Sequence, residues 1–367
     1  MPATTPSDLD RLSAGTLAWL GRHLDHFDPY AAPARPAEHG RAKAALELAL
    51  LCHLWARRAG ADDSRLGRAT AVLRTVWQHP DLPRLLTADP RCAVQYALVG
   101  AALAPGGTDT AACRAALARL APDGLSPHGT SPYQRLELRH YADKAGVPHT
   151  IEPYEELLGR NFLVRLPAEL ADRTDRAGGA GGAGGADPGA APVTVPEAYA
   201  LTHSSFYFSD FGRTASGLSG KALADAAELV RRLLEHSVRH DWWDLAAELV
   251  MTQVCLGLDP LGTPWGRAAV DCLARAQRPD GALPGRSAAT AAADAEPAGS
   301  FFAKAYHTTL VTALMTLLLR PETTLPTRPA GPEQPALSEP ARPGSVPPRS
   351  VPLRPVPPRP VLPERAS

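Results

Sequence analysis

The sequence predicts an all-α fold of paired helices, and three observations predict it. Apolar residues recur three and four positions apart along most of the chain. No segment shows the sustained alternation of β-branched and polar residues that is typical of half-buried strands. Amphipathic segments alternate with segments that are apolar nearly all round, as expected for outer helices followed by inner ones. We therefore expect two layers of helices and no strands.

The N-terminal region shows this alternation first. Ser7 is a residue type that caps helix N-termini. The apolar stripe after it consists of Leu9, Leu12, Leu17, Leu20, Leu24 and Phe27. Residues 44–55 are apolar nearly all round, which indicates an inner helix. Five further pairs follow the same pattern, namely 63–79 with 92–103, 109–120 with 131–145, 152–170 with 196–211, 217–239 with 241–257, and 262–277 with 302–319.

Three segments interrupt the helices. Residues 173–192 repeat Ala-Gly-Gly and can bury nothing, so we expect a flexible insert there. Arg286–Ser300 is rich in alanine and is expected to be a loop. Residues 321–367 hold 15 of the 38 prolines and no aromatic residue, which predicts a disordered, Pro-rich tail. The two halves of the helical region should then be residues 1–172 and 193–320.

Charge and cysteine content exclude several classes of protein. The chain has 38 Lys and Arg against 38 Asp and Glu, with the two signs interspersed, so we expect no nucleic-acid partner. No stretch approaches 18 uninterrupted apolar residues, and the N-terminus lacks the pattern of a secretion signal, so we expect no membrane partner. The five cysteines are odd in number and form no CxxC motif, which is typical of reduced thiols. These features predict a cytoplasmic protein.

The tail contains two motifs that could recruit a protein partner. Pro352-Leu-Arg-Pro355 and Pro355-Val-Pro-Pro358 fit the PxxP pattern of polyproline II ligands. The arginines among them would suit an acidic groove lined by aromatic residues. The alternative is a stiff extension that binds nothing.

Six antiparallel pairs can close into a barrel around a central cavity or stay open as an α-solenoid. The segment Gln277-Arg-Pro-Asp-Gly281 leads into Lys304-Ala-Tyr-His-Thr-Thr309. This combination resembles the turn and Tyr-His-Thr inner helix of the α/α-toroid superfamily, which contains the terpenoid cyclases and the protein prenyltransferases. The resemblance implies that the pairs close into an α/α toroid. The DxDD and DDxxD motifs of terpenoid cyclases are absent, so that activity is not expected.

A second resemblance covers more of the chain. Residues 198–212, Asp241-Trp-Trp-Asp244 and Tyr306-His307 are similar to an uncharacterised bacterial family, a domain of unknown function. This resemblance implies a fold and a pocket, and no known activity.

One predicted inner helix combines aromatic and ionisable residues. Its residues Tyr199, His203, Phe206, Tyr207 and Asp210 fall on one helical face. His203 and Asp210 lie two turns apart, so they could flank one ligand. We therefore predict these two residues as acid–base groups. Tyr199, Phe206 and Tyr207 are the predicted ligand-binding walls.

Both ionisable groups also have a structural interpretation. Asp210 lies beside Gly212, the expected C-cap, where the helix dipole disfavours a carboxylate. An ion pair with Arg213 would compensate for that position. His203 could be a hydrogen-bonded core histidine beside Tyr207.

Tyr306 and His307 open the last inner helix. In protein prenyltransferases a Tyr-His-Thr in this setting supplies a histidine ligand of the catalytic zinc, together with an upstream Asp-x-Cys pair. Here Asp271 and Cys272 are adjacent and precede the turn at Gln277, so the resemblance does not extend to the zinc site. We expect no metal and no cofactor, because one histidine does not make a zinc site. His307 is predicted as a third acid–base group and Tyr306 as a wall.

Trp242 and Trp243 project about 100° apart on a helix, so only one can face a cavity, and Trp242 is the predicted lining residue. Two functions remain open. The first is an enzyme of specialised metabolism that acts on an apolar or aromatic small molecule or peptide in a central cavity. The second is a non-catalytic binding or accessory protein that uses its helical surface and its tail. A hollow axis where His203, Asp210 and His307 converge would favour the enzyme.

Overall fold

The computed structural model describes residues 6–31, 38–58, 63–120, 125, 130–179, 193–285 and 298–320. All regular structure in these residues is helical, which confirms the predicted all-α class. Residues 1–323 form one compact unit, and a second unit, residues 324–367, lies outside the described ranges. Among the described helices, none combines the length and the hydropathy that crossing a bilayer requires.

The first half of the chain folds into the helices α1 (Pro6–Arg22), η1 (Leu24–Phe27), α2 (Glu38–Ala56), α3 (Ser64–Gln78), α4 (Leu82–Leu86), α5 (Ala93–Ala102), α6 (Ala111–Leu120), α7 (Pro132–Ala145), α8 (Tyr154–Gly159) and α9 (Phe162–Gly179). The second half folds into α10 (Val195–Phe208), α11 (Gly220–Arg239), α12 (Trp243–Cys255), η2 (Pro260–Gly262), α13 (Pro264–Ala276) and α15 (Ala298–Leu318).

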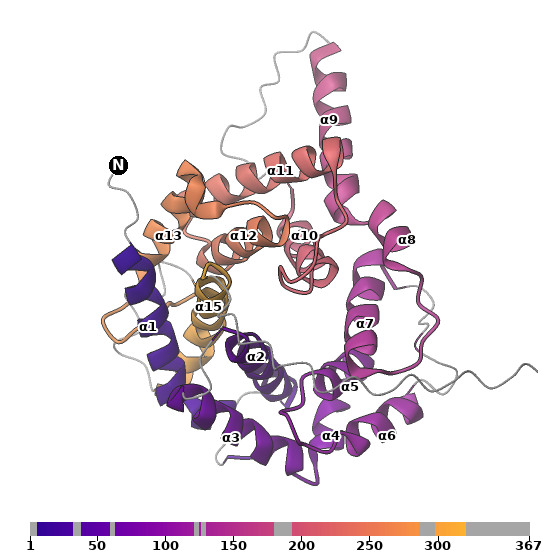
Figure 1. Ribbon diagram of the computed structural model, residues 1–367, viewed down its shortest axis with the longest axis vertical. Helices are drawn as coiled ribbons and strands as arrows, with labels where there is room; N and C mark the ends of the chain where they lie inside the picture. Colours follow the sequence, from indigo (N-terminus) through magenta and orange to yellow (C-terminus); the bar gives the residue numbers. More distant parts are fainter. Residues whose placement is uncertain are drawn as a thin grey trace, which may run out of the picture. The chain divides into compact units, whose positions relative to one another are not determined.

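The described helices of this unit lie in an inner and an outer layer (Figure 1). The inner helices are α2, α5, α7, α10, α12 and α15. Each packs against the next in this order, and α15 packs against α2. The outer helices α1, α3, α6, α9, α11 and α13 each contact at least one inner helix. The inner helices therefore bring segments from both ends of the chain together.

Burial separates the two layers as the hydrophobic pattern predicts. In the inner helix α12 every residue from Leu245 to Gln253 is buried. In the outer helix α11 the buried residues form one stripe, from Ala226 through Leu229 and Leu233 to Ser237. An amphipathic helix needs cover on one face only, whereas an apolar one needs it all round.

Residues 152–170, predicted as one helix, form two. α8 ends at Gly159 and α9 begins at Phe162. Between them the fully buried Asn161 accepts a hydrogen bond from the Leu163 backbone N–H at 3.0 Å through its Oδ1 atom. A side-chain oxygen at this position caps the start of the next helix, so the chain turns here.

The helix predicted at 196–211 ends early, at Phe208. Asp210, Phe211 and Gly212 have φ values of 45°, 56° and 77°, in the left-handed region. The Phe211 N–H donates to the Phe206 carbonyl oxygen at 2.8 Å, which closes the end of the helix. The prediction that Asp210 shares a helical face with His203 is therefore wrong, because the backbone reverses before it.

The Gln277–Gly281 turn packs against the first helix. The Gln277 Nε2 atom donates to the Leu12 carbonyl oxygen at 3.0 Å and to the Gly281 carbonyl oxygen at 3.2 Å. Gly281 has a φ of 94°, and a Cβ atom there would overlap the carbonyl oxygen of Gly15. The turn thus joins the C-terminal part of this unit to α1 through a close approach of two backbones.

Several predicted segments fall outside the described residues. Of the insert predicted at 173–192, residues up to Gly179 belong to α9, and 180–192 are not described. Of the loop predicted at Arg286–Ser300, residues 286–297 are not described and α15 begins at Ala298. The Pro-rich segment 321–367 lies wholly outside.

Candidate functional site

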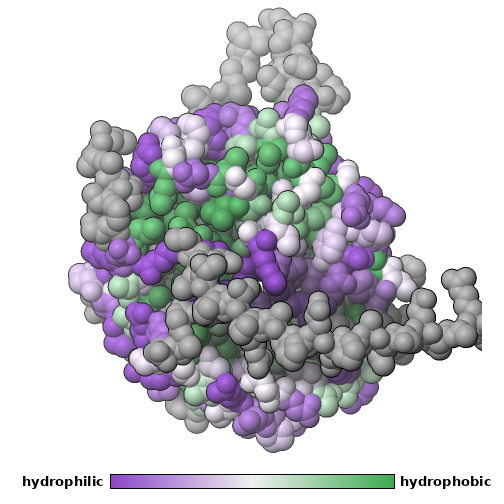
Figure 2. All heavy atoms as spheres, in the orientation of Figure 1, coloured by the Kyte–Doolittle hydropathy of each residue, from purple (hydrophilic) through white to green (hydrophobic). Residues whose placement is uncertain are grey.

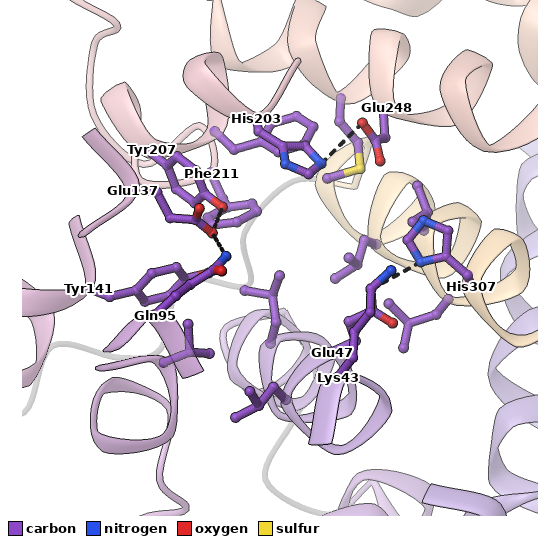
Figure 3. A pocket seen from close by; sticks show the side chains of 18 of the residues that line it. Lys43, Glu47, Gln95, Glu137, Tyr141, His203, Tyr207, Phe211, Glu248 and His307 are labelled. Atoms are coloured by element: carbon purple, nitrogen blue, oxygen red, sulfur yellow. Dashed lines mark hydrogen bonds and ion pairs between the residues drawn. The ribbon is translucent and has the colours of Figure 1, made fainter. Parts of the chain in front are cut away.

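A cavity of about 220 Å³ is lined by side chains from all six inner helices (Figure 3). Its aliphatic wall is formed by Leu46, Leu50, Val99, Met251, Leu310, Val311 and Leu314. Its aromatic wall is formed by Tyr96, Tyr133, Tyr141, Phe206, Tyr207 and Phe211. Three carboxylates and two histidines face the same space. Such a cavity combines apolar cover with a few placed polar groups, as small-molecule sites do.

His203 of α10 forms the first polar cluster with Glu248 of α12 (Figure 3). The His203 Nε2 atom lies 3.5 Å from Glu248 Oε2, and its Nδ1 atom lies 2.9 Å from the Tyr133 hydroxyl. Glu248 is buried and also accepts a hydrogen bond from the Thr202 hydroxyl at 2.6 Å. Burial is the largest influence on the pKa of His203 and lowers it, but the charge and hydrogen bond of Glu248, together with the Glu137 charge, outweigh burial and raise that pKa above its ordinary value.

His307 of α15 forms the second polar cluster with Glu47 of α2. The His307 Nδ1 atom lies 3.1 Å from Glu47 Oε1, and Lys43 Nζ lies 3.6 Å from the same oxygen. Burial favours the neutral forms of both groups. The interaction between His307 and Glu47 favours the charged forms, and it raises the pKa of His307 and lowers the pKa of Glu47. One third of the His307 side chain, 33 %, stays accessible, as does the same share of His203. Both imidazoles can therefore meet a ligand.

Glu137 of α7 anchors a third polar cluster, on another side of the cavity (Figure 3). Its Oε1 atom accepts hydrogen bonds from the Tyr207 hydroxyl at 2.6 Å and from Gln95 Nε2 at 2.7 Å. Burial and the Glu137 charge raise the pKa of Tyr207 well above its ordinary value, so Tyr207 stays a hydrogen-bond donor.

The two His–Glu pairs influence each other across the cavity. The charge of His307 lowers the pKa of His203, and the charge of Glu248 raises the pKa of His307. These contributions are smaller than those within each pair. Among the charged groups, each cavity histidine is therefore influenced most by its own carboxylate.

Asp210 lies away from this cavity, in a second hollow that Tyr207 also borders. Its Oδ1 atom accepts from Lys144 Nζ at 2.9 Å, and its Oδ2 atom lies 3.6 Å from Arg213 NH1. Burial opposes its charge, but Lys144 keeps the pKa of Asp210 below its ordinary value. The ion pair with Arg213 is present, and the stronger partner is Lys144, which the sequence did not indicate.

The second hollow is a groove of about 820 Å³ between α7, α8 and the turn after α10. Hydrophilic residues gather on this face of the molecule over α8, whereas hydrophobic residues come into view over α12 and α13 (Figure 2).

Beside Asp210 in the groove lies the buried His140. Burial and the nearby Lys144 charge lower the pKa of His140 to about 4, so its ring is neutral.

The other predicted residues divide between the cavity and its surroundings. Phe206 and Tyr207 line the cavity together with His203 and His307. Three predicted walls do not line it. Tyr199 donates to Asp244 Oδ2 at 2.5 Å, Trp242 stacks edge-on against His236, and Tyr306 packs edge-on against Phe27 of η1. These three aromatic residues pack helices together, although the Tyr306 hydroxyl also helps to lower the pKa of Glu47.

The carboxylate partners of both histidines were not predicted from the sequence. Glu47 and Glu248 are each a carboxylate flanked by apolar residues within an inner helix, which was a usable signal because unpaired charges are rarely buried. Glu137 stands between Arg135 and Arg139, so nothing in its neighbourhood set it apart. Phe211 reaches the cavity only through the left-handed turn.

The donor groups of the cavity do not suit a metal ion. Within the ranges that the structure describes, no group of three or more His, Cys, Asp or Glu side chains is arranged to hold one. Asp271 and Cys272, the nearest parallel to a zinc-binding pair, lie on α13 and do not line the cavity.

Comparison with known proteins gives a family and no activity. No curated protein matches the chain. No solved structure matches it either. The model of one family, described as a domain of unknown function, matches residues 13–317 and so spans every helix that lines the cavity. The chain therefore belongs to the DUF6895 family, a domain of unknown function.

Proposed function

We propose that this chain is an enzyme that binds an apolar small molecule in the central cavity and moves protons with the His203–Glu248 and His307–Glu47 pairs. The single observation that carries the proposal is that two separate His–Glu pairs open into one largely apolar cavity. A structural protein would gain little from two partly accessible imidazoles at its centre.

We further propose that the helices form a closed α/α toroid. The order of inner-helix contacts, which runs from α2 through α5, α7, α10 and α12 to α15 and returns to α2, supports closure. The hydrogen bond from Gln277 to the Leu12 carbonyl oxygen of α1 supports closure as well. An open solenoid would leave its two ends without such contacts.

The chemistry of the two pairs suits proton transfer. A histidine can serve as an acid when protonated and as a base when neutral, and the raised pKa of His203 and of His307 favours the protonated form of each. Each carboxylate fixes the orientation of its ring, and the hydrophobic wall excludes water from the ligand. One pair could therefore give a proton to a ligand while the other removes one. Asp210 is not part of this proposal, because Lys144 and Arg213 hold it in the groove.

The proposal is tested by incubating the purified full-length protein with a small-molecule extract and following the extract by mass spectrometry. The double variant His203→Asn with His307→Asn removes both acid–base groups and keeps polar side chains. The matched control is His240→Asn, because His240 is an exposed histidine at the end of α11, outside the cavity. We expect the wild-type protein and the control to consume the same compound, and the double variant to leave it unchanged.

The alternative is a non-catalytic protein that only binds its ligand. The apolar walls of the cavity support this alternative as much as they support the enzyme, since they would serve binding as well as catalysis. It predicts that native mass spectrometry detects a bound compound that is released unaltered after long incubation. In that outcome the acid–base role is wrong and the binding role stands.

Two further features are also proposals. A cytoplasmic location is supported by the five free thiols of the chain. A protein partner for residues 321–367 is supported by the PxxP motifs, and deletion of that segment should then remove a specific partner from affinity purifications.

A further inference from the structure

Tyr133 of α7 connects the His203–Glu248 pair to the ligand space. Its hydroxyl lies 2.9 Å from His203 Nδ1, while His203 Nε2 faces Glu248 Oε2 at 3.5 Å. The imidazole is therefore engaged at both nitrogens, by a carboxylate on one side and a phenol on the other. Tyr133 is only partly buried, and it lines the cavity.

The protonation state of His203 decides where the Tyr133 proton points. Glu248 only accepts, so His203 must carry its first proton on Nε2. A neutral His203 then accepts the Tyr133 O–H at Nδ1. A protonated His203 instead donates from Nδ1 to the Tyr133 oxygen, and the Tyr133 O–H is released for another acceptor.

We propose, building on the function proposed above, that Tyr133 donates this hydrogen bond to an oxygen atom of the ligand, so that the ligand is an apolar molecule carrying a carbonyl or similar neutral oxygen acceptor. The aliphatic wall opposite takes the hydrocarbon part. Protonated His203 strengthens the donor by binding the Tyr133 oxygen.

A neutral acceptor fits this position better than an anion. Glu137 lies one helical turn after Tyr133, and Glu248 lies behind His203. An anionic ligand at the Tyr133 hydroxyl would meet both carboxylates in a site of low dielectric, where repulsion is strong. The neighbouring Tyr207 gives its own proton to Glu137, so it does not offer a second donor.

The cavity volume limits the size of the hydrocarbon part. An apolar cavity of about 150 Å³ accommodates benzene, and the cavity here is about 220 Å³. A single aromatic ring with a short acyl group is therefore a suitable probe. Acetophenone carries the ketone, and ethylbenzene has a similar shape without the oxygen.

The experiment measures the binding of both probes to the full-length protein, and the carbonyl stretching frequency of ¹³C-labelled acetophenone in the complex. The test variant is Tyr133→Phe, which removes only the hydroxyl. The matched control is Tyr154→Phe, which also removes one tyrosine hydroxyl but lies in the groove outside the cavity, where that hydroxyl donates to Asp143. We expect Tyr133→Phe to weaken acetophenone binding roughly three- to tenfold and to leave ethylbenzene binding unchanged.

The infrared band separates the two proposals. In the wild-type protein and in Tyr154→Phe the band should shift to lower frequency, and in Tyr133→Phe it should lie where it does in a hydrocarbon solvent. If both probes bind but the band and the affinities are the same in all three proteins, the role of Tyr133 is wrong and the binding cavity stands. If neither probe binds the wild-type protein, the proposed binding function is overturned together with the role of Tyr133.

A measurement on the wild-type protein alone covers the case in which Tyr133→Phe does not fold. The lowered carbonyl frequency should revert as the pH rises and His203 loses its proton. A frequency that stays constant while His203 titrates would overturn the proposal. The titratable groups around His203 are Glu248 on α12, Tyr133 and Glu137 on α7, His307 on α15, and Tyr199 and Tyr207 on α10 itself. His203 titration is followed by NMR in the same samples.

Discussion

The His307 Nδ1 atom lies 3.1 Å from Glu47 Oε1, so a residue of the last described helix is paired with a residue of the second. This contact joins α15 to α2 inside the cavity. A second contact, from Gln277 to the Leu12 carbonyl oxygen, joins the turn after α13 to α1 on the outside. The two ends of the compact unit are thus held together in both layers.

Removing the His307 imidazole should destabilise the fold in a pH-dependent way. The folded pKa of His307 is raised, so its contribution is full below the unfolded value of about 6.5 and is lost as the pH rises through the folded pKa. We expect His307→Asn to cost roughly 1–2 kcal/mol at about pH 6 and less at about pH 8.5. Urea denaturation at both pH values measures this.

The control for this prediction is His240→Asn, at an exposed histidine outside the cavity. Its effect on the free energy of unfolding should be small at both pH values. Equal destabilisation by His307→Asn at the two pH values would show that lost packing, and not the ion pair with Glu47, accounts for the effect.

Glu248→Gln should bring the pKa of His203 down. Burial favours the neutral ring, and the Glu248 charge is the largest contribution that raises the pKa above its ordinary value. Titration of His203 by NMR in the variant should therefore show a midpoint below that of the wild-type protein. Glu235→Gln is the control, because Glu235 pairs with Arg231 on the outer helix α11. An unchanged midpoint in Glu248→Gln would contradict the ion pair.

Gly281→Ala should destabilise the unit strongly. The substitution places a side chain at a φ of 94° and drives its Cβ atom into the Gly15 carbonyl oxygen. Gly257→Ala is the matched control, since Gly257 has a φ of 77° and open space around it. The Gly257→Ala variant therefore measures only the free-energy cost of a left-handed backbone conformation in alanine, about 1–2 kcal/mol. We expect Gly281→Ala to cost at least about 2 kcal/mol more in urea denaturation.

The comparison of Gly281→Ala with Gly257→Ala tests whether the packing of the Gln277 turn against α1 stabilises the unit. Equal losses in the free energy of unfolding would mean that α1 can shift away from the new side chain without further destabilisation. In that case the contact would not hold the ends of the unit together.

Asp210→Asn should leave ligand binding in the cavity unchanged. Asp210 lines the groove and pairs with Lys144, and it does not line the cavity. Asparagine tolerates the left-handed conformation found there, so the loss of stability should be limited to the ion pair, about 1 kcal/mol or less. Acetophenone and ethylbenzene titrations measure the binding. A clear loss of affinity for either probe would show that Asp210 contributes to ligand binding.

The site was predictable in part because its two histidines stand out locally. His203 lies among aromatic residues, and His307 follows Tyr306 within a largely apolar helix. Asp210 was misplaced because three consecutive left-handed residues are not visible in a pattern of spacings. Tyr199, Trp242 and Tyr306 were assigned to the cavity since clustered aromatic residues look alike in a core and in a pocket.

The sequence by itself determined the helices and the layer to which each belongs, because hydrophobic periodicity is a local property and each helix must bury its apolar face. Only the tertiary structure decided which carboxylate meets which histidine. His307 and Glu47, like His203 and Glu248, come from separate helices, and their pairing depends on how those helices pack. Residue spacing within one helix does not show which distant segments come into contact, so these His–Glu pairs could be recognised only in the packed structure.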